Sequence, residues 1–140
     1  MSQSNKGVGS QGPKIMYGRK SLNRDMWQVD ISFATNGASS PVASTVKGRL
    51  VTSVTRSGTG TYVVTLQDYW ADYIAGLARL NLASPTKQRA MISGVPNLAT
   101  GLTLTVVTID SSSGAAVDVA AAAGNEVHLK LFLSTASFGV

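Results

Sequence analysis

Few side chains of this chain could do chemistry, and those few are far apart in the sequence. One histidine, His128, and no cysteine occur among the 140 residues. A zinc site takes three or four ligands from cysteine, histidine and carboxylate side chains. No cluster of that size surrounds His128. We therefore expect no metal site, no thiolate chemistry and no bound cofactor.

The remaining candidates for acid–base or nucleophilic chemistry favour a structural interpretation. No serine lies in the G-x-S-x-G context of a nucleophile elbow. Asp68 and Asp72 are close in sequence, but Asp68 follows a predicted strand, where aspartate commonly accepts backbone N–H bonds in a turn. The run 58–60 (Gly-Thr-Gly) lacks the lysine of a phosphate-binding loop, so its glycines are expected to allow positive φ in a tight turn. We predict that the protein is not an enzyme.

The elements that would position these residues are short β-strands, because apolar and polar residues alternate along much of the chain. The last strand is the clearest: Val127, Leu129, Leu131 and Leu133 alternate with polar or outward residues, and His128 takes an outward position. Further strands are predicted at 27–33, 46–55, 62–66, 78–82, 89–95 and 102–109.

Two segments are harder to interpret. Residues 69–77 place apolar side chains at a helical spacing, but Gly76 interrupts them, and we expect a loop or one helical turn. Residues 115–123 are mostly alanine, which favours helix, yet the segment is short and ends at Gly124. A marginal helix and a loop with one short strand both fit this second segment. In the strand predicted at 62–66, Tyr62, Val64 and Leu66 are expected to face inward.

Roughly seven or eight short strands separated by turn signals predict an all-β fold, either a β-sandwich or a small barrel. We expect one such body at residues 25–140 and an extended, flexible N-terminal arm at residues 1–24. No apolar run is long enough to span a bilayer, and the first residues lack the apolar core of a secretory signal. We therefore expect no membrane partner, and synthesis in a cytosol.

The arm holds all of the excess positive charge. The chain has 12 basic and 7 acidic residues, a net charge of +5. Five basic residues and no acid precede Asp25, and from Asp25 onward seven basic residues are balanced by seven acids. The candidate partner-binding residues are the five cations of the arm and three adjacent apolar residues: Lys6, Lys14, Ile15, Met16, Tyr17, Arg19, Lys20 and Arg24.

Two kinds of partner fit a basic arm. Such arms bind nucleic acid by displacing counterions from phosphates, but five charges over 24 residues are dilute and no aromatic residues are interleaved with an arginine cluster. The alternative is an arm that lies on a neighbouring protein subunit, to which it adds backbone hydrogen bonds and apolar anchors. We favour protein over nucleic acid as the partner of the arm.

The succession of strands in residues 46–134 resembles that of small virion proteins of tailed bacteriophages, in particular capsid decoration (cement) proteins. The resemblance is carried by the strand-forming runs 58–68, 102–110 and 124–134. It implies a jelly-roll-like or related β-sandwich on the outer surface of the capsid. It also implies the major capsid protein as partner, a homotrimer as the assembly, and no catalytic residue.

On this resemblance we expect a structural virion protein, made in the host cytoplasm, that stabilises the shell by bridging neighbouring capsid subunits. A tail- or head-fibre domain with a receptor-binding tip is an alternative, as is a coat protein whose arm binds the packaged genome.

Overall fold

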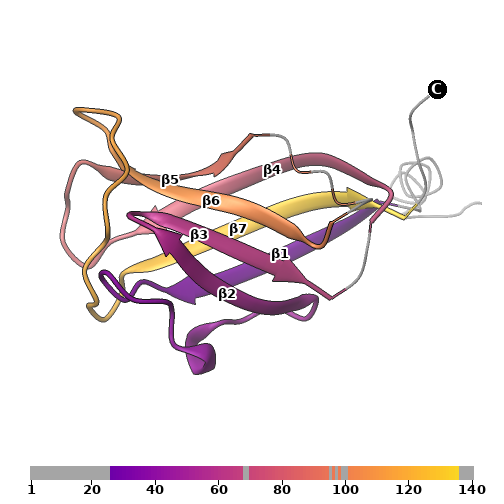
Figure 1. Cartoon of the computed structure of the whole chain (residues 1–140), viewed down its shortest axis with the longest axis horizontal. Coiled ribbons are helices and arrows are strands. Elements are labelled where there is room, and N and C mark those ends of the chain that lie inside the picture. Colours follow the sequence, from indigo (N-terminus) through magenta and orange to yellow (C-terminus); the bar gives the residue numbers. More distant parts are fainter. Residues whose placement is uncertain (1–25, 68–69, 95, 97, 99–100, 136–140) are drawn as a thin grey trace, which may run out of the picture.

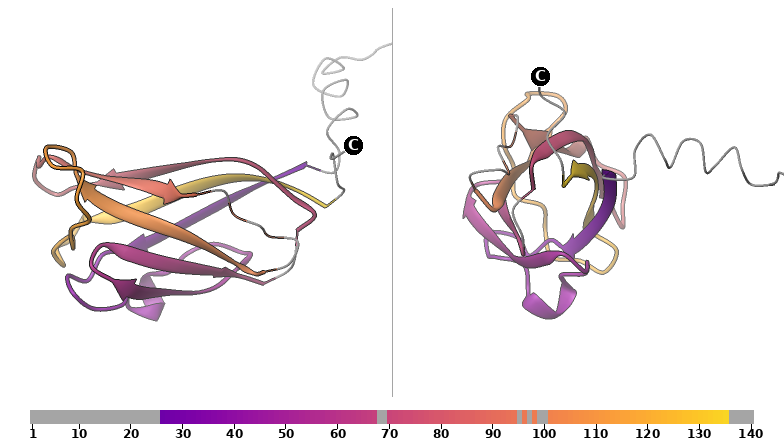
Figure 2. Two further views of the ribbon diagram at one scale, coloured as in Figure 1. Left: turned by 45° about the horizontal axis from the view of Figure 1, so that its top comes forward. Right: turned by 90° about the vertical axis from the view of Figure 1, so that its right-hand side faces the viewer.

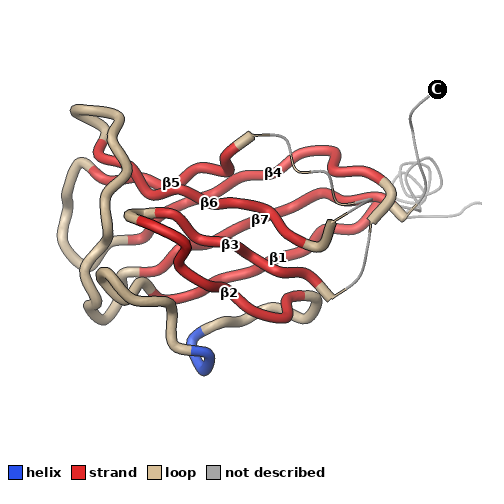
Figure 3. The backbone as a smooth tube through the Cα atoms, viewed as in Figure 1, coloured by secondary structure: helices blue, strands red, loops and turns tan. Residues whose placement is uncertain are grey.

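The computed structural model describes residues 26–67, 70–94, 96, 98 and 101–135, which form a β-sandwich of two antiparallel sheets (Figure 1). One sheet has three strands in the order β1-β7-β4, and the other has four in the order β2-β3-β6-β5. The two sheets face each other along the long axis of the molecule (Figure 2). The strands are β1 (Met26–Ala34), β2 (Val51–Gly58), β3 (Thr61–Leu66), β4 (Asp72–Asn81), β5 (Gln88–Ser93), β6 (Thr103–Asp110) and β7 (Glu126–Ser134). The predicted all-β sandwich is confirmed, and within the described residues the only helix is the 3-10 turn η2 (Ala43–Thr45), shown in Figure 3.

The last strand, β7, is the centre of the three-stranded sheet. It pairs with β1 over its whole length, from Met26 opposite Ser134 to Ala34 opposite Glu126, and with β4 on its other side. The predicted inward residues of β7 are buried, at 0 to 3% exposure. His128 and Lys130 lie on the opposite face, as the alternation predicts.

The four-stranded sheet supplies the other half of the core. Tyr62, Val64 and Leu66 of β3 are completely buried, which confirms the predicted inward face. The ring of Tyr62 lies against Phe33 of β1, with the two ring centroids 5.2 Å apart. This aromatic pair joins the two sheets, because Phe33 belongs to the three-stranded sheet and Tyr62 to the four-stranded sheet.

The prediction for residues 69–77 is wrong. Residues 72–77 are extended and continue into 78–81 as the single strand β4, while Asp68 and Tyr69 lie outside the described residues. A β-bulge between Tyr73 and Ala75 breaks the alternation. Beyond it, small residues, Gly76 and Ala78, face inward, so the buried side of this strand carries little of the apolar signal that marks strands.

Two further predictions need correction or refinement. The strand expected at 46–55 begins only at Val51, because the chain first makes the turn η2 and a single bridge between Lys47 and Ser32. The alanine-rich segment 115–123 is not helical. It is a loop that touches β6 through one bridge between Ala116 and Ile109, so of the two alternatives the loop with a very short strand is the closer.

The register of β7 generates a prediction about stability. Leu131→Asp would place a charge in a completely buried position, which costs several kcal/mol out of a total of roughly 5–15 kcal/mol. Urea unfolding should therefore show a large loss for Leu131→Asp and nearly none for the exposed neighbour change Lys130→Ser. Equal losses from the two changes would contradict the register.

Candidate partner-binding surfaces

The structure describes only some of the residues that the sequence analysis considered for binding or catalysis. All eight arm candidates, Lys6 to Arg24, precede residue 26 and lie outside the described residues. His128 is half-exposed, and its Nε2 atom lies 3.1 Å from a carboxylate oxygen of Glu126, two residues away on the same face of β7. This contact between exposed groups on one strand is a surface pair, and no serine hydroxyl takes part in it within the described residues.

The outer face of the three-stranded sheet, which we call the sheet face, carries a mixed apolar and charged surface. Residues that are opposite each other in an antiparallel sheet share a face. Phe132 of β7 lies between Gln28 and Ala75, and Lys130 lies between Asp30 and Leu77. The next row places His128 between Ser32 and Arg79. Leu77 is 67% exposed and is the most exposed large apolar side chain among the described residues.

A shallow groove of about 600 Å³ runs over the sheet face toward the segment that leads into β2. Its cationic lining residues are Lys47, Arg79 and Lys130, against a single carboxylate, Asp30. No salt bridge links any of these four side chains to another described residue. The groove therefore presents positive charge that neighbouring side chains of the described chain do not neutralise.

A second groove, of about 480 Å³, lies along the free side of β1, and we call it the edge groove. It is lined by Trp27, Gln28, Val29, Asp30, Gly48, Arg49 and Leu50. Trp27 is 52% exposed although it stands on the inward side of β1. Its ring packs edge-on against Trp70, with the ring centroids 6.3 Å apart, and the buried indole N–H of Trp70 has no hydrogen-bond acceptor among the described residues.

The edge groove exists because β1 is only partly covered on its free side. Ser32 exchanges both backbone hydrogen bonds with Lys47, at 2.9 and 2.7 Å, and its N–H and C=O therefore point away from β7. Backbone groups alternate in direction along an antiparallel strand, so those of Gln28 and Asp30 point the same way. No bond from these groups to a residue across the free edge occurs among the described backbone contacts. The covering segment turns away at Gly48, toward β2.

Sequence reasoning missed both surfaces. Leu77 lies in the segment predicted as a loop or one helical turn, and the alternation places Trp27 in a half-buried strand without indicating its exposure. The exposure of Trp27 depends on where the segment 47–50 leaves β1, and no pattern within residues 27–33 reports that. The basic side chains of the sheet face come from residues 47, 79 and 130, which are distant in sequence and become neighbours only through the sheet.

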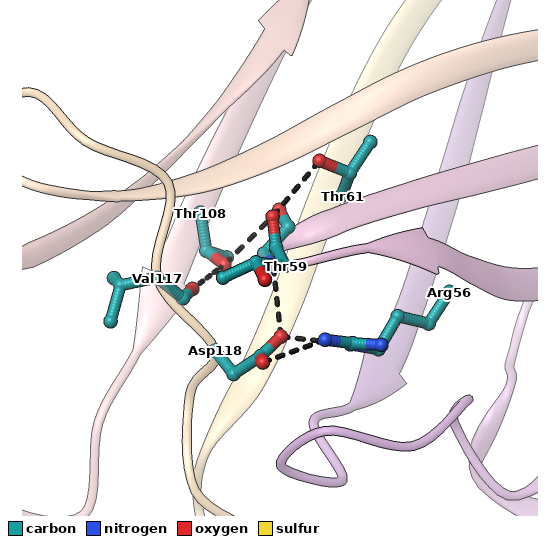
Figure 4. A network of polar contacts seen from close by, with 7 residues as sticks. Arg56, Thr59, Thr61, Thr108, Val117 and Asp118 are labelled. Carbon is teal, nitrogen blue, oxygen red and sulfur yellow. Dashed lines mark hydrogen bonds and ion pairs between the residues drawn. The ribbon is translucent and has the colours of Figure 1, made fainter.

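A polar network, which we call the clasp, fastens the alanine-rich loop to the four-stranded sheet (Figure 4). The guanidinium of Arg56 on β2 donates two hydrogen bonds of 2.8 Å to the carboxylate of Asp118 in the loop. The backbone N–H of Gly60, in the turn between β2 and β3, donates a third of 2.8 Å. The buried hydroxyl of Thr108 on β6 donates to the carbonyl of Val117 at 2.6 Å.

In the clasp one carboxylate, that of Asp118, is held by several hydrogen-bond donors, which changes its chemistry. The hydrogen bonds from Arg56 first, and from Gly60 second, lower the pKa of Asp118 below its ordinary value of 3.8. The bond to Asp118 likewise raises the pKa of the Arg56 guanidinium. A carboxylate with a lowered pKa is a weak base, and both of its oxygens are occupied. The clasp is therefore suited to holding the loop in place rather than to proton transfer.

The lowered pKa of Asp118 implies a pH-dependent contribution to stability. A carboxylate with a lower pKa in the folded state stabilises the fold above its unfolded-state pKa, and this contribution is lost as the pH falls through the folded-state pKa. Asp118→Asn should thus lower the urea midpoint near neutral pH, and the difference from the unmodified protein should shrink in acid below about pH 4. A difference that stays constant from neutral pH to acid would contradict this role.

A double-mutant cycle provides the control for the clasp. Arg56→Gln and Asp118→Asn remove the two sides of one contact, so their effects should be less than additive near neutral pH. Additive effects would show that Asp118 acts independently of Arg56.

Gly60 generates a second prediction from the clasp. Its φ is +60°, and a Cβ atom there would lie 2.6 Å from the carbonyl oxygens of Thr108 and Val117. Both atoms are backbone, so no side chain can move aside. Gly60→Ala should destabilise the protein by more than the roughly 1 kcal/mol that a change from glycine costs through φ alone. Gly37→Ala is the matched control, because Gly37 also has a positive φ but has open space around it.

Comparisons with protein-family models, curated protein sequences and solved structures gave no match for this chain. Among the residues that the structure describes, no helix is long and apolar enough to cross a membrane. In the same residues no three histidine, cysteine, aspartate or glutamate side chains gather into a group that could hold a metal ion. The functional assignment therefore rests on the sheet face, the edge groove and the arm.

Proposed function

We propose that this protein is a structural virion protein of the capsid-decoration kind. On this proposal it binds the outer surface of a capsid, as a homotrimer, and stabilises the shell by bridging neighbouring copies of the major capsid protein. The observation that carries the proposal is the sheet face, where exposed apolar side chains are bordered by charged ones. The resemblance of the strand pattern to decoration proteins suggests capsid protein as the class of partner.

The sheet face has the composition of a protein–protein interface. Its centre is formed by Leu77, Ala75 and the half-buried Phe132, and its border by charged residues such as Arg79 and Lys130. Interfaces commonly combine an apolar, aromatic centre with a polar rim that contains arginine. Leu77 is 67% exposed, and covering this side chain with a partner would be favourable because it removes apolar surface from water.

The charges around the sheet face favour an acidic partner. Three cations and one carboxylate line its groove, and complementary charge on the partner would speed association and fix its orientation. The basic arm would add to the same attraction, because in the sequence it leads directly into β1, an outer strand of this sheet. Both surfaces together would let one copy touch more than one neighbour, which is what bridging requires.

The low charge of the chain supports self-association. Charged residues are 14% of the sequence, below the roughly 25% of an ordinary soluble domain. Fewer charges leave more of the surface to be covered by other subunits. A closed homotrimer would cover part of it before the chain meets a capsid.

Substitution of Leu77 tests the sheet face. Leu77→Asp should leave folding intact, because the side chain is exposed, and should weaken assembly by about tenfold, or ~1.4 kcal/mol, as expected for a central interface residue. The measurement is the native mass of the purified chain, followed by co-sedimentation with capsid shells from the same source.

Met91→Asp is the matched control for this test. Met91 is also an exposed apolar residue on a strand, but it lies on β5 of the other sheet. Equal weakening by both changes would mean that general surface hydrophobicity drives assembly. A purified chain that is a stable monomer at micromolar concentration and stays unbound in the presence of shells would overturn the proposed function.

A further inference from the structure

We propose that the edge groove is the docking site for residues 14–18 from the N-terminal arm of a second copy, which add to β1 as an antiparallel strand. The inference rests on the proposed function and deepens it, since it names the contact by which one copy holds the next. The acceptor is the part of β1 from Met26 to Asp30, which shares the edge groove with residues 48–50 but makes no backbone hydrogen bond to them among the described contacts.

The backbone of β1 provides the hydrogen bonds. Gln28 and Asp30 direct their N–H and C=O groups to the free side of the strand, by alternation from Ser32. Lys47 closes the far end at Ser32, so an incoming strand has room from Asp30 toward Met26 and no further. That length suits about five residues, and an exposed strand edge of this kind is a known template for β-augmentation.

The side chains of the groove match the alternation of the arm segment. An antiparallel strand with Lys14 opposite Asp30 puts Tyr17 opposite Trp27 and Ile15 opposite Val29. Residues opposite one another share a face, so Ile15 and Tyr17 would cover the apolar side of the groove, which is formed by the half-exposed Trp27 together with Leu50. A shift by one residue would turn both anchors away from it.

The outer side of the same pairing is complementary in charge. Asp30 is an exposed carboxylate whose one side-chain contact within the described residues is the amide of Gln28, at 3.2 and 3.3 Å to its two oxygens. The arm carries five cations and no acid. In the register given above, Lys14 stands opposite Asp30 and on its side of the sheet. Asp30 is also the single carboxylate of the sheet-face groove, whose other charged residues are cations and would not attract the arm.

The connection between the arm segment and β1 favours a second copy as the donor. To pair with its own β1, the segment would have to turn back through residues 19–25, a connection of seven residues that contains one asparagine, Asn23, and neither glycine nor proline. Hairpin connections are commonly two to five residues long, so a connection of seven residues is longer than usual. Donation to a neighbour needs no turn, and exchange of one element between identical chains is a low-cost route to assembly.

Cysteine cross-linking tests the site directly, because the natural chain contains no cysteine. The proposed register places residue 16 opposite Gln28, and paired residues have Cα atoms about 5.5 Å apart, within the range for a disulfide. A full-length Met16→Cys chain is mixed with a full-length, affinity-tagged Gln28→Cys chain under mild oxidation. The expected result is a covalent heterodimer as the main product on a non-reducing gel. A Met16→Cys chain mixed with a Met91→Cys chain, which carries its thiol on the other sheet, should give little.

A second variant keeps the test independent of thiol chemistry. Gln28→Pro removes the outward N–H that the added strand would use, and leaves the hydrogen bonds between β1 and β7 in place because that N–H does not face β7. With its melting temperature preserved, this chain should lose self-association as strongly as a chain that carries Ile15→Ser and Tyr17→Ser.

The outcomes separate this inference from the proposed function. A double-cysteine Met16→Cys/Gln28→Cys chain that links only within itself, or a mixture without heterodimer, would overturn the docking of a second copy. The effect of Leu77→Asp on shell binding would then still test the proposed function independently. Heterodimer formation by a chain that does not bind capsid shells would support the docking site and contradict the proposed capsid-binding function.

Discussion

The arrangement of this molecule depends on the register of β7 between β1 and β4. Four apolar residues of β7 are buried against the four-stranded sheet, at most 3% exposed. Because side chains alternate with a period of two, a slip of one residue would expose all four and bury Lys130. Burying the charge of Lys130 alone would cost several kcal/mol, so the observed pairing of β7 is strongly favoured over the slipped one. The pairing in turn fixes β1, whose nine residues are matched to β7 one by one.

The same register determines which side chains form the sheet face. Once the leucines of β7 face the core, Phe132, Lys130 and His128 must face outward, and the rows they form with β1 and β4 follow from the pairing. The apolar centre and basic border of the sheet face are therefore a consequence of core packing. The clasp lies on the opposite sheet, where the ion pair between Arg56 and Asp118 holds a loop in which Val119 is the one buried residue of the segment 115–123.

What the sequence could predict follows from how local each determinant is. The alternation in β7 and β3 lies within one strand, so inward residues such as Leu131 and Tyr62 were predicted correctly. The second half of β4 matches the strand predicted at 78–82, but its first half was missed, because a bulge at Ile74 shifts the phase and Gly76 replaces a large inward side chain. The partner of Asp118 is 62 residues away, and the groove cations come from three separate segments. Only the fold brings such groups together, so no pattern of spacing in the sequence indicates them.

The partial cover of the free edge of β1 limits how strongly an added strand can bind there. Thr45 and Lys47 occupy the half of the edge near Ala34 and Ser32, which leaves one short stretch open rather than a whole strand. An added strand of five residues must lose backbone entropy of about 1–2 kcal/mol per residue, against a few hydrogen bonds of about 1 kcal/mol each and the burial of two side chains. The balance is close to zero for a dilute chain. It becomes favourable where neighbouring copies are held together by another surface, because the local concentration of arms is then high. On the proposed docking, contacts that hold copies together, in the homotrimer or on the shell, therefore form first, and the exchange of arms then locks copies that are already in place.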